Sequence, residues 1–197
     1  LLSGRAMVPS ARSQDDGATI MTTVLVRANT LLDGTGEPAI RGGAAVAIAD
    51  GIIQAVGPRD AVPAPADAEI VELGGETSIL PGIVDGHVHL MLGVPNDPFH
   101  HQARVDRTRT LLWGASNALA CLAAGLTTIF DCGGPGDTPM VLRDTIRSGL
   151  IQGPRMLAAG APITTTAGHC NWLGNRADSK DEAVKAVRTL VQQEADF

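Results

Sequence analysis

The sequence contains few cysteines, and they follow none of the patterns of a cysteine-based site. Cys121, Cys132 and Cys170 are odd in number, and no two of them form a C-x-x-C pair. This spacing argues against a disulfide framework and against a zinc site built from cysteines. We therefore expect reduced thiols and a cytoplasmic protein.

Long apolar runs and basic clusters are also missing. No stretch approaches the roughly 20 apolar residues of a membrane span, and residues 1–20 lack the apolar core of a signal peptide. We expect residues 1–20 to be a disordered leader, with Met21 a candidate for the natural first residue. The net charge of −6 and the scattered lysines and arginines predict that neither nucleic acid nor a membrane is a partner.

What is present is the composition of a globular protein, because 44% of the 197 residues are hydrophobic and 18% are charged. Residues 21–80 alternate short β-like runs with turn residues. The dipeptide Asp50-Gly51 between two apolar runs predicts a two-residue hairpin. We expect a small antiparallel sheet, part of a β-sandwich domain over residues 21–80, with strands at Val24–Asn29, Ala44–Ala49, Ile52–Val56, Glu69–Leu73 and Thr77–Leu80.

After Pro81 the pattern changes to strands that alternate with helices, which indicates an α/β fold with a parallel sheet, open or closed into a barrel. Gly125 and Gly149 suit helix ends, and Asp178 or Ser179 suits a helix start. The expected strands are Ile83–His89, Leu126–Asp131 and Arg155–Ala159, and the expected helices are Asp106–Ala124, Pro139–Ser148 and Ser179–Glu194.

Three strand–helix units over residues 81–197 cannot close an eight-stranded barrel of about 250 residues. The rhythm also requires a fourth strand after Phe197. We therefore expect the chain to be the N-terminal part of a longer protein.

The first of these strands carries His87 and His89. Side chains alternate along a strand, so both imidazoles should lie on one face, close enough to reach one metal ion. Strict alternation would place Asp85 and Ile83 on the same face. It would place Val84, Val88 and Leu90 on the other. Two histidines two positions apart also occur by chance, so the surrounding sequence must decide between a metal site and a structural pair.

Three segments, residues 31–38, 49–57 and 80–89, resemble the opening of the amidohydrolase superfamily, in which a small β-sandwich precedes a TIM-like (β/α)8 barrel. The resemblance implies that His87 and His89 bind one of one or two divalent metal ions, usually zinc. It also implies that the other ligands come from strands four to eight, beyond Phe197. We therefore expect this chain alone to be inactive. The full-length protein would hydrolyse amide or peptide-like C–N bonds with metal-activated water.

Within the superfamily, residues 163–172 and 127–134 resemble the prolidase-like branch, which includes Xaa-Pro dipeptidases. The resemblance implies that His169 contacts a carbonyl or carboxylate of a small amide or dipeptide-like substrate. It also allows a homo-oligomer of the full-length protein. Cys170-Asn171-Trp172 departs from the glycine-rich loop of that branch, which leaves the substrate open.

Several other residues allow a structural and a functional interpretation. Asp85 could accept a hydrogen bond from a metal-bound histidine, or could be a polar residue bonded to the barrel backbone. Asp131 could contact the site or cap a loop. The remaining candidates for the pocket border are His100, His101 and Trp172, for which exposed-loop or core positions are equally good interpretations.

Alternative functions also remain open at this point. The same superfamily contains deaminases and cyclic-amide hydrolases, which use similar metal chemistry. Outside it, the polymerase-and-histidinol-phosphatase phosphoesterases also begin a barrel with His-x-His. A third alternative, from another class, is a truncated binding module without catalytic activity.

Overall fold

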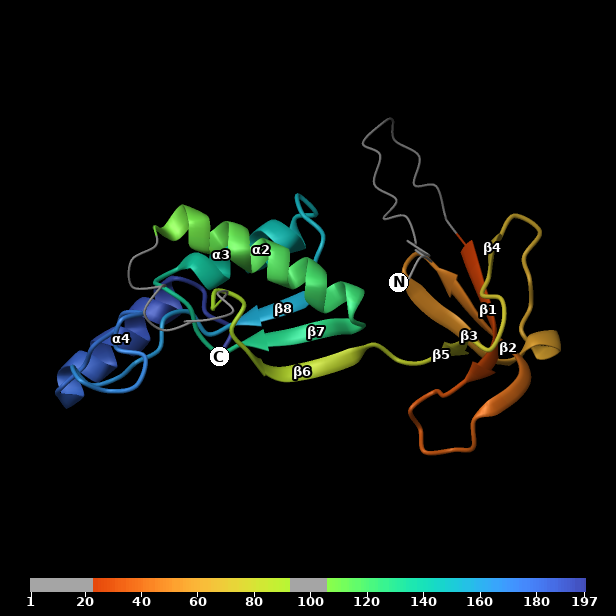
Figure 1. Cartoon of the computed structure of the whole chain (residues 1–197), viewed down its shortest axis with the longest axis horizontal. Coiled ribbons are helices and arrows are strands. Elements are labelled where there is room, and N and C mark those ends of the chain that lie inside the picture. Colours follow the sequence, from red (N-terminus) through yellow and green to blue (C-terminus); the bar gives the residue numbers. More distant parts are fainter. Residues whose placement is uncertain (1–22, 93–105) are drawn as a thin grey trace. The chain divides into compact units, whose positions relative to one another are not determined.

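The computed structural model describes residues 23–92 and 106–197, which belong to two compact units, Leu1–Pro81 and Gly82–Phe197 (Figure 1). The predicted leader, residues 1–20, lies outside the described residues, as do His100 and His101. Of the helices in the described ranges, none has the length and apolar character needed to cross a bilayer.

The first unit contains one five-stranded sheet. Its strands are β1 (Thr23–Leu31), β2 (Ile40–Ala49), β3 (Ile52–Pro58), β4 (Glu69–Glu72) and β5 (Ser78–Ile79), and a short 3-10 helix, η1 (Arg59–Ala61), follows β3. The main order is β3-β2-β1-β4, and β5 also pairs with β1.

The prediction of an antiparallel sheet is only half right. β1 pairs antiparallel with β2, and β2 pairs antiparallel with β3, but β4 and β5 both lie parallel to β1. The connection after β3, which includes η1, carries the chain across the sheet before β4 begins. A long connection of this kind permits parallel addition, whereas a tight turn does not.

The predicted hairpin at Asp50-Gly51 is confirmed, because it joins β2 to β3 with φ angles of 51° and 76°. Two positive φ angles are typical of a type I′ turn, whose twist matches that of the strands. β2 contributes to apolar clusters on both sides of the sheet. Ala45 and Ala47 pack with Leu25, and Ala44 and Val46 pack in the second cluster.

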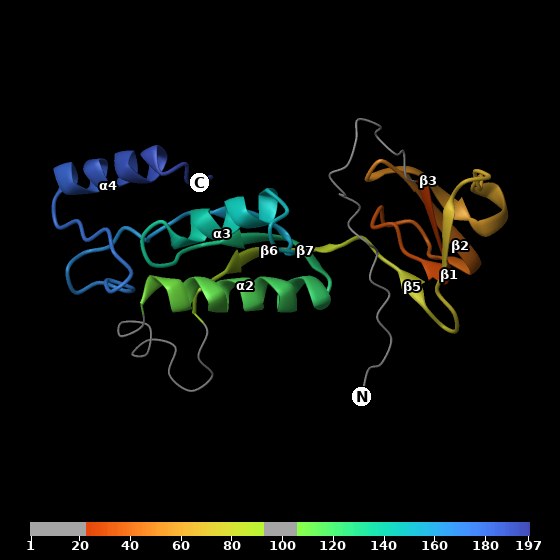
Figure 2. The same ribbon diagram turned by 90° about the horizontal axis from the view of Figure 1, so that it is seen from above.

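The second unit is a parallel three-stranded sheet covered by helices. Its strands, in the order β6-β7-β8, are β6 (Ile83–Val88), β7 (Leu126–Asp131) and β8 (Arg155–Ala158). Its helices are α2 (Arg107–Ala123), α3 (Thr138–Arg147) and α4 (Lys180–Gln192). The helices α2 and α3 cover one face of the sheet (Figure 1) and lie side by side over it (Figure 2). This is the strand–helix alternation predicted from the sequence.

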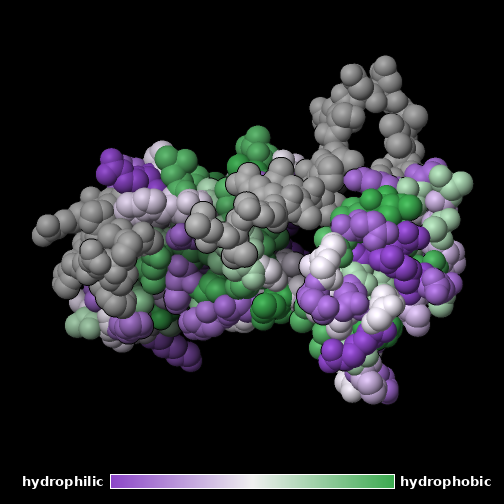
Figure 3. Space-filling view, turned by 45° about the vertical axis from the view of Figure 1, so that its right-hand side comes forward, coloured by the Kyte–Doolittle hydropathy of each residue, from purple (hydrophilic) through white to green (hydrophobic). Residues whose placement is uncertain are grey.

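The core of the second unit fills the space between the sheet and these helices. It is built from apolar side chains of the sheet, of the helices α2 and α3, and of the loop after β6: Leu90, Met91, Ala118, Ile129, Met140, Leu142, Met156 and Ala158. Burial of such side chains contributes most of the favourable free energy of folding. Apolar residues also reach the surface (Figure 3). Val84 in this unit and Ile53 in the first are both exposed.

The predicted helix ends are also confirmed. Gly125 and Gly149 follow α2 and α3 with φ angles of 93° and 76°, a conformation that glycine adopts without steric cost. Ser179 caps α4 and forms a reciprocal capping box with Glu182.

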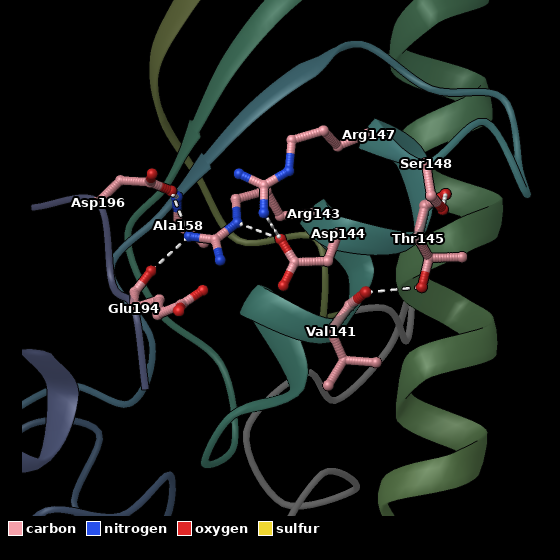
Figure 4. Close-up of polar contacts among 9 residues, drawn as sticks. All are labelled: Val141, Arg143, Asp144, Thr145, Arg147, Ser148, Ala158, Glu194 and Asp196. Atoms are coloured by element: carbon pink, nitrogen blue, oxygen red, sulfur yellow. Dashed lines mark hydrogen bonds and ion pairs between the residues drawn. The ribbon is translucent and has the colours of Figure 1, made fainter. Parts of the chain in front are cut away.

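The segment after α4 lies along the free edge of β8 and is held by Arg143, a cationic side chain that is only 4% exposed (Figure 4). The Asp196 N–H donates to the Ala158 carbonyl at 2.9 Å, and its carboxylate accepts from the Ala158 N–H at 2.8 Å. Arg143 donates to the Asp196 carboxylate at 2.7 Å and to the Glu194 carbonyl at 2.6 Å. The ring of Phe197 lies 5.7 Å from that of Phe130 on β7. These contacts hold residues 194–197 at the edge of β8 that does not pair with β7.

Candidate metal centre

His87 and His89 lie at the carboxyl end of β6, the edge where parallel α/β sheets bind ligands. Their ring centroids are 5.1 Å apart, and the ring planes meet at 78°. His87 is exposed and His89 is half-buried. The separation lets both rings reach one ion at the zinc–nitrogen distance of about 2.0–2.1 Å. The pair therefore fits the role of two ligands to a shared cation.

The ring of His89 is oriented by a backbone group. Its Nδ1 lies 2.9 Å from the carbonyl oxygen of Gly133, in the loop after β7. A carbonyl oxygen can only accept, so Nδ1 carries the hydrogen in this contact. In the neutral ring, Nε2 then keeps its lone pair, which is the state that a metal ligand requires. This partner lies 44 residues away in the chain and was not predicted.

Asp131, the last residue of β7, organises the same loop from a fully buried position. Its Oδ2 accepts from the N–H of Leu90 at 2.9 Å, and its Oδ1 accepts from the N–H of Gly133 at 3.0 Å. Burial raises the pKa of Asp131 to about 6, against the lowering effect of these two N–H groups and of His89. Of the two interpretations left open by the sequence, these bonds support the loop cap.

Asp85 does not share the histidine face, which corrects the prediction from strict alternation. It is in register with Ile129, whose side chain belongs to the core beneath the helices. The pKa of Cys121 on α2 is raised mainly by burial, and the charge of Asp85 raises it further. The cause is a register shift between Asp85 and Val88, where three residues of β6 span two of β7 and alternation breaks down. The Asp85 carboxylate accepts from the backbone N–H of His87 at 3.0 Å.

The glycines after β7 allow the loops of the site to approach one another closely. The N–H of Gly134 donates to the carbonyl of Gly160, in the loop after β8. A Cβ atom on Gly134 would lie only 2.7 Å from Met91 Cγ and 2.8 Å from Pro139 Cγ, so a larger residue cannot fit without displacement. Glycine at this position therefore lets the loop after β7 pack directly against Met91 and Pro139.

His169 lies in the long loop between β8 and α4 and is exposed. Its ring contacts that of Trp172 edge-on, with centroids 6.4 Å apart. Asp178 ties the loop together, since it accepts from the Thr166 N–H at 2.8 Å and from the Thr166 hydroxyl. These hydrogen bonds lower the pKa of Asp178. Asp178 therefore restrains the loop that carries His169, and this loop follows the same edge of the sheet as the histidine pair.

The cysteines near this edge do not resemble activated nucleophiles. Burial raises the pKa of Cys132, with further contributions from Asp131 and Asp85, and burial also raises the pKa of Cys170. A nucleophilic cysteine needs the opposite shift, toward the thiolate. The raised pKa values of Cys132 and Cys170 therefore argue against a cysteine nucleophile at this edge.

Within residues 23–92 and 106–197, no group of three or more His, Cys, Asp or Glu side chains is arranged to hold a metal ion. A site at His87 and His89 would thus need ligands from outside the described part of the chain.

Comparisons with known proteins connect this geometry to one family. The chain is 30% identical to an ochratoxinase of Aspergillus niger over 148 residues, which are 74% of this chain and 29% of that protein. It is 44% identical to an allantoinase of Streptomyces avermitilis over 89 residues, 45% of this chain and 16% of that protein. The chain thus spans less than a third of the curated relatives that it matches.

Among solved structures, a Xaa-Pro dipeptidase with methionine bound in its active site is 25% identical, with a TM-score of 0.73. The match covers 89% of this chain and 46% of that one. The fold is therefore the α/β fold expected, the incomplete N-terminal part of a TIM-like barrel protein. Residues 78–197 match the amidohydrolase family itself. The chain belongs to the amidohydrolase family.

Proposed function

We propose that the full-length protein containing this chain is a metal-dependent hydrolase that cleaves the amide or peptide-like C–N bond of a small molecule, with His87 and His89 as two of its metal ligands. The observation that carries the proposal is the geometry of the pair. The two rings lie 5.1 Å apart, and His89 is oriented by Gly133 so that Nε2 is left for a cation.

A bound divalent cation, with zinc the candidate that two imidazoles favour, lowers the pKa of a water molecule and polarises a carbonyl group. The residues of this chain prepare for that chemistry. The Gly133 carbonyl holds the proton on Nδ1 of His89 and so fixes its tautomer. His169, supported by Trp172, is proposed to orient a carbonyl or carboxylate of the substrate.

The preferred substrate class is a dipeptide or an N-acyl amino acid. Support comes from the Xaa-Pro dipeptidase structure, which matches 89% of this chain. The ochratoxinase match runs over 74% of the chain and supports membership of the same family of hydrolases. A second candidate is a cyclic amide, favoured by the 44% identity to an allantoinase, although that match covers a shorter segment.

The test uses the full-length protein, stripped with a chelator and reloaded with zinc, cobalt or manganese. We expect metal-dependent hydrolysis, measured on Xaa-Pro dipeptides, N-acyl amino acids and allantoin in parallel. His87→Ala and His89→Ala should each lose bound metal and activity. His169→Ala should keep its metal and lower kcat/KM, which separates a substrate contact from a metal ligand.

Metal content that is unchanged in the His87→Ala/His89→Ala double variant would refute the assigned ligands. Full activity of the stripped protein would refute the metal-dependent mechanism. Hydrolysis of allantoin but of no linear amide would select the second candidate. For the 197-residue chain alone we expect no activity, because the described residues supply too few ligands to close a metal site.

A further inference from the structure

We propose that Asp131 is a positioning residue for His89, acting through the backbone and without touching the imidazole. The inference rests on the proposed function, since it assigns a role toward the metal-binding state of His89. It is carried by a closed circuit of three hydrogen bonds that links the carboxylate, the loop after β7 and the histidine ring.

The circuit begins beside the histidine. The N–H of Leu90, the next residue after His89, donates to Asp131 Oδ2 at 2.9 Å. The other oxygen, Oδ1, accepts from the N–H of Gly133 at 3.0 Å. The carbonyl of that glycine then accepts from His89 Nδ1 at 2.9 Å. Asp131 therefore holds both the backbone that carries the imidazole and the backbone that orients it.

Gly133 needs such a restraint. Its φ angle is 151°, a conformation open mainly to glycine, the residue with the greatest backbone freedom. The peptide that carries this carbonyl is also held at its other end, since the Gly134 N–H donates to the Gly160 carbonyl at 3.2 Å. Loss of the bond to Asp131 frees the peptide on the other side of Gly133 and so weakens the hold on the carbonyl that faces His89. A Cβ atom on Gly133 would lie 3.4 Å from Pro162 Cδ and 3.7 Å from His89 Cε1, so this backbone already lies against the ring.

The chemistry of the site requires a carboxylate. Both oxygens of Asp131 accept from backbone N–H groups, so each must be an acceptor. An asparagine would point its NH₂ group, a donor, at one of those N–H groups. Asp131→Asn therefore preserves the size of the side chain and breaks the circuit at a single point.

The experiment measures zinc affinity of the full-length protein by competition with a chromophoric chelator, and records the absorption spectrum of the cobalt-loaded protein. For Asp131→Asn we expect zinc affinity to fall about 10- to 100-fold, the range found when groups that support metal ligands are removed. The cobalt bands should shift as the geometry at His89 changes. Gly133→Ala, which keeps the carboxylate but strains the glycine, should also weaken zinc binding.

Two further variants separate a positioning role from a loss of stability. Leu142→Ala opens a cavity in the core of the same unit without removing any hydrogen-bonding group of the circuit. It should lower Tm while leaving zinc affinity within about twofold of wild type. His89→Ala is the reference for loss of a ligand.

The outcomes are distinct. Wild-type zinc affinity and an unchanged cobalt spectrum in Asp131→Asn would overturn the inference, and so would equal losses in Asp131→Asn and Leu142→Ala. In either case, loss of metal in His89→Ala would leave the proposed function standing. Wild-type metal binding in His89→Ala would overturn both.

Discussion

Asp131 and Asp178 perform the same local task in opposite surroundings. Each carboxylate accepts backbone N–H groups or hydroxyl groups and so fixes a loop that follows the carboxyl end of a strand. Asp131 is fully buried and its pKa is raised to about 6, whereas Asp178 is exposed and its pKa is lowered. The loss of hydration therefore outweighs the stabilisation that the two N–H groups give to the Asp131 carboxylate.

Asp196 shows what a cation adds to this comparison. Its side chain is 29% exposed, and burial raises its pKa. The hydrogen bonds from Arg143 and Ala158 and the charge of Arg143 act in the other direction and prevail, so the pKa of Asp196 is lowered. Three influences therefore set the pKa of these anchoring carboxylates. Loss of hydration raises the pKa, whereas hydrogen-bond donors and a cationic partner lower it.

The largest expected effect is that of Asp131→Ala. It leaves two N–H donors unpaired in a buried site, each of which costs about 1–3 kcal/mol. We expect the free energy of unfolding to fall by about 3–5 kcal/mol, measured by urea denaturation. Asp137→Ala is the matched control, because Asp137 is half-exposed and pairs with an exposed arginine. Equal effects of the two substitutions would contradict the importance of burial.

Arg143→Met tests the cation-paired case. It removes the partner of Asp196 and the donor to the Glu194 carbonyl (Figure 4). The isolated carboxylate is partly hydrated, so we expect a loss of about 2–4 kcal/mol in unfolding free energy, somewhat less than for a fully buried pair. Arg147→Met is the control, since Arg147 is 65% exposed and should contribute below about 1 kcal/mol. A smaller loss for Arg143→Met than for Arg147→Met would refute this interpretation.

Opposite pH dependences should follow from the opposite pKa shifts, measured on metal-free protein. Unfolded aspartate titrates near about 3.9. Between about pH 4 and 6, folded Asp131 keeps a proton that the unfolded chain has released, so stability falls as pH rises. Relative to Asp131→Asn, this fall should be on the order of 2–3 kcal/mol. The contribution of Asp178 is present above about pH 4 and is lost as pH falls through its lowered pKa, relative to Asp178→Asn. Parallel slopes for both pairs would contradict the comparison.

The smallest effect is expected for Asp178→Ala. Water replaces the lost acceptor at this exposed position, so Tm should change by less than about 2–4 °C. The local effect should be clearer, because the Thr166 amide loses its partner and should exchange its hydrogen faster. Amides of β7 serve as the internal control. Unchanged exchange at Thr166 would show that Asp178 does not hold the loop.

The features that were predicted correctly depend on residues close together in the chain. The Asp50-Gly51 hairpin, the glycines after α2 and α3, and the capping box at Ser179 are all local signals. The features that were missed depend on distant partners. Asp85 was placed on the wrong face because alternation cannot reveal a register shift against β7. The anchoring role of Arg143 was not predicted, because Glu194 and Asp196 lie 51 and 53 residues away from it in the chain.

The sequence alone determined the order of strands and helices, the change of pattern at Pro81, and the two histidines at the end of β6, because periodicity and turn chemistry act over a few residues. The tertiary structure decided which face Asp85 takes, which carbonyl orients His89, and whether Asp131 supports that contact. These depend on how β6 and β7 are aligned and on what the packing removes from water. Neither the alignment nor the burial is encoded in any single segment.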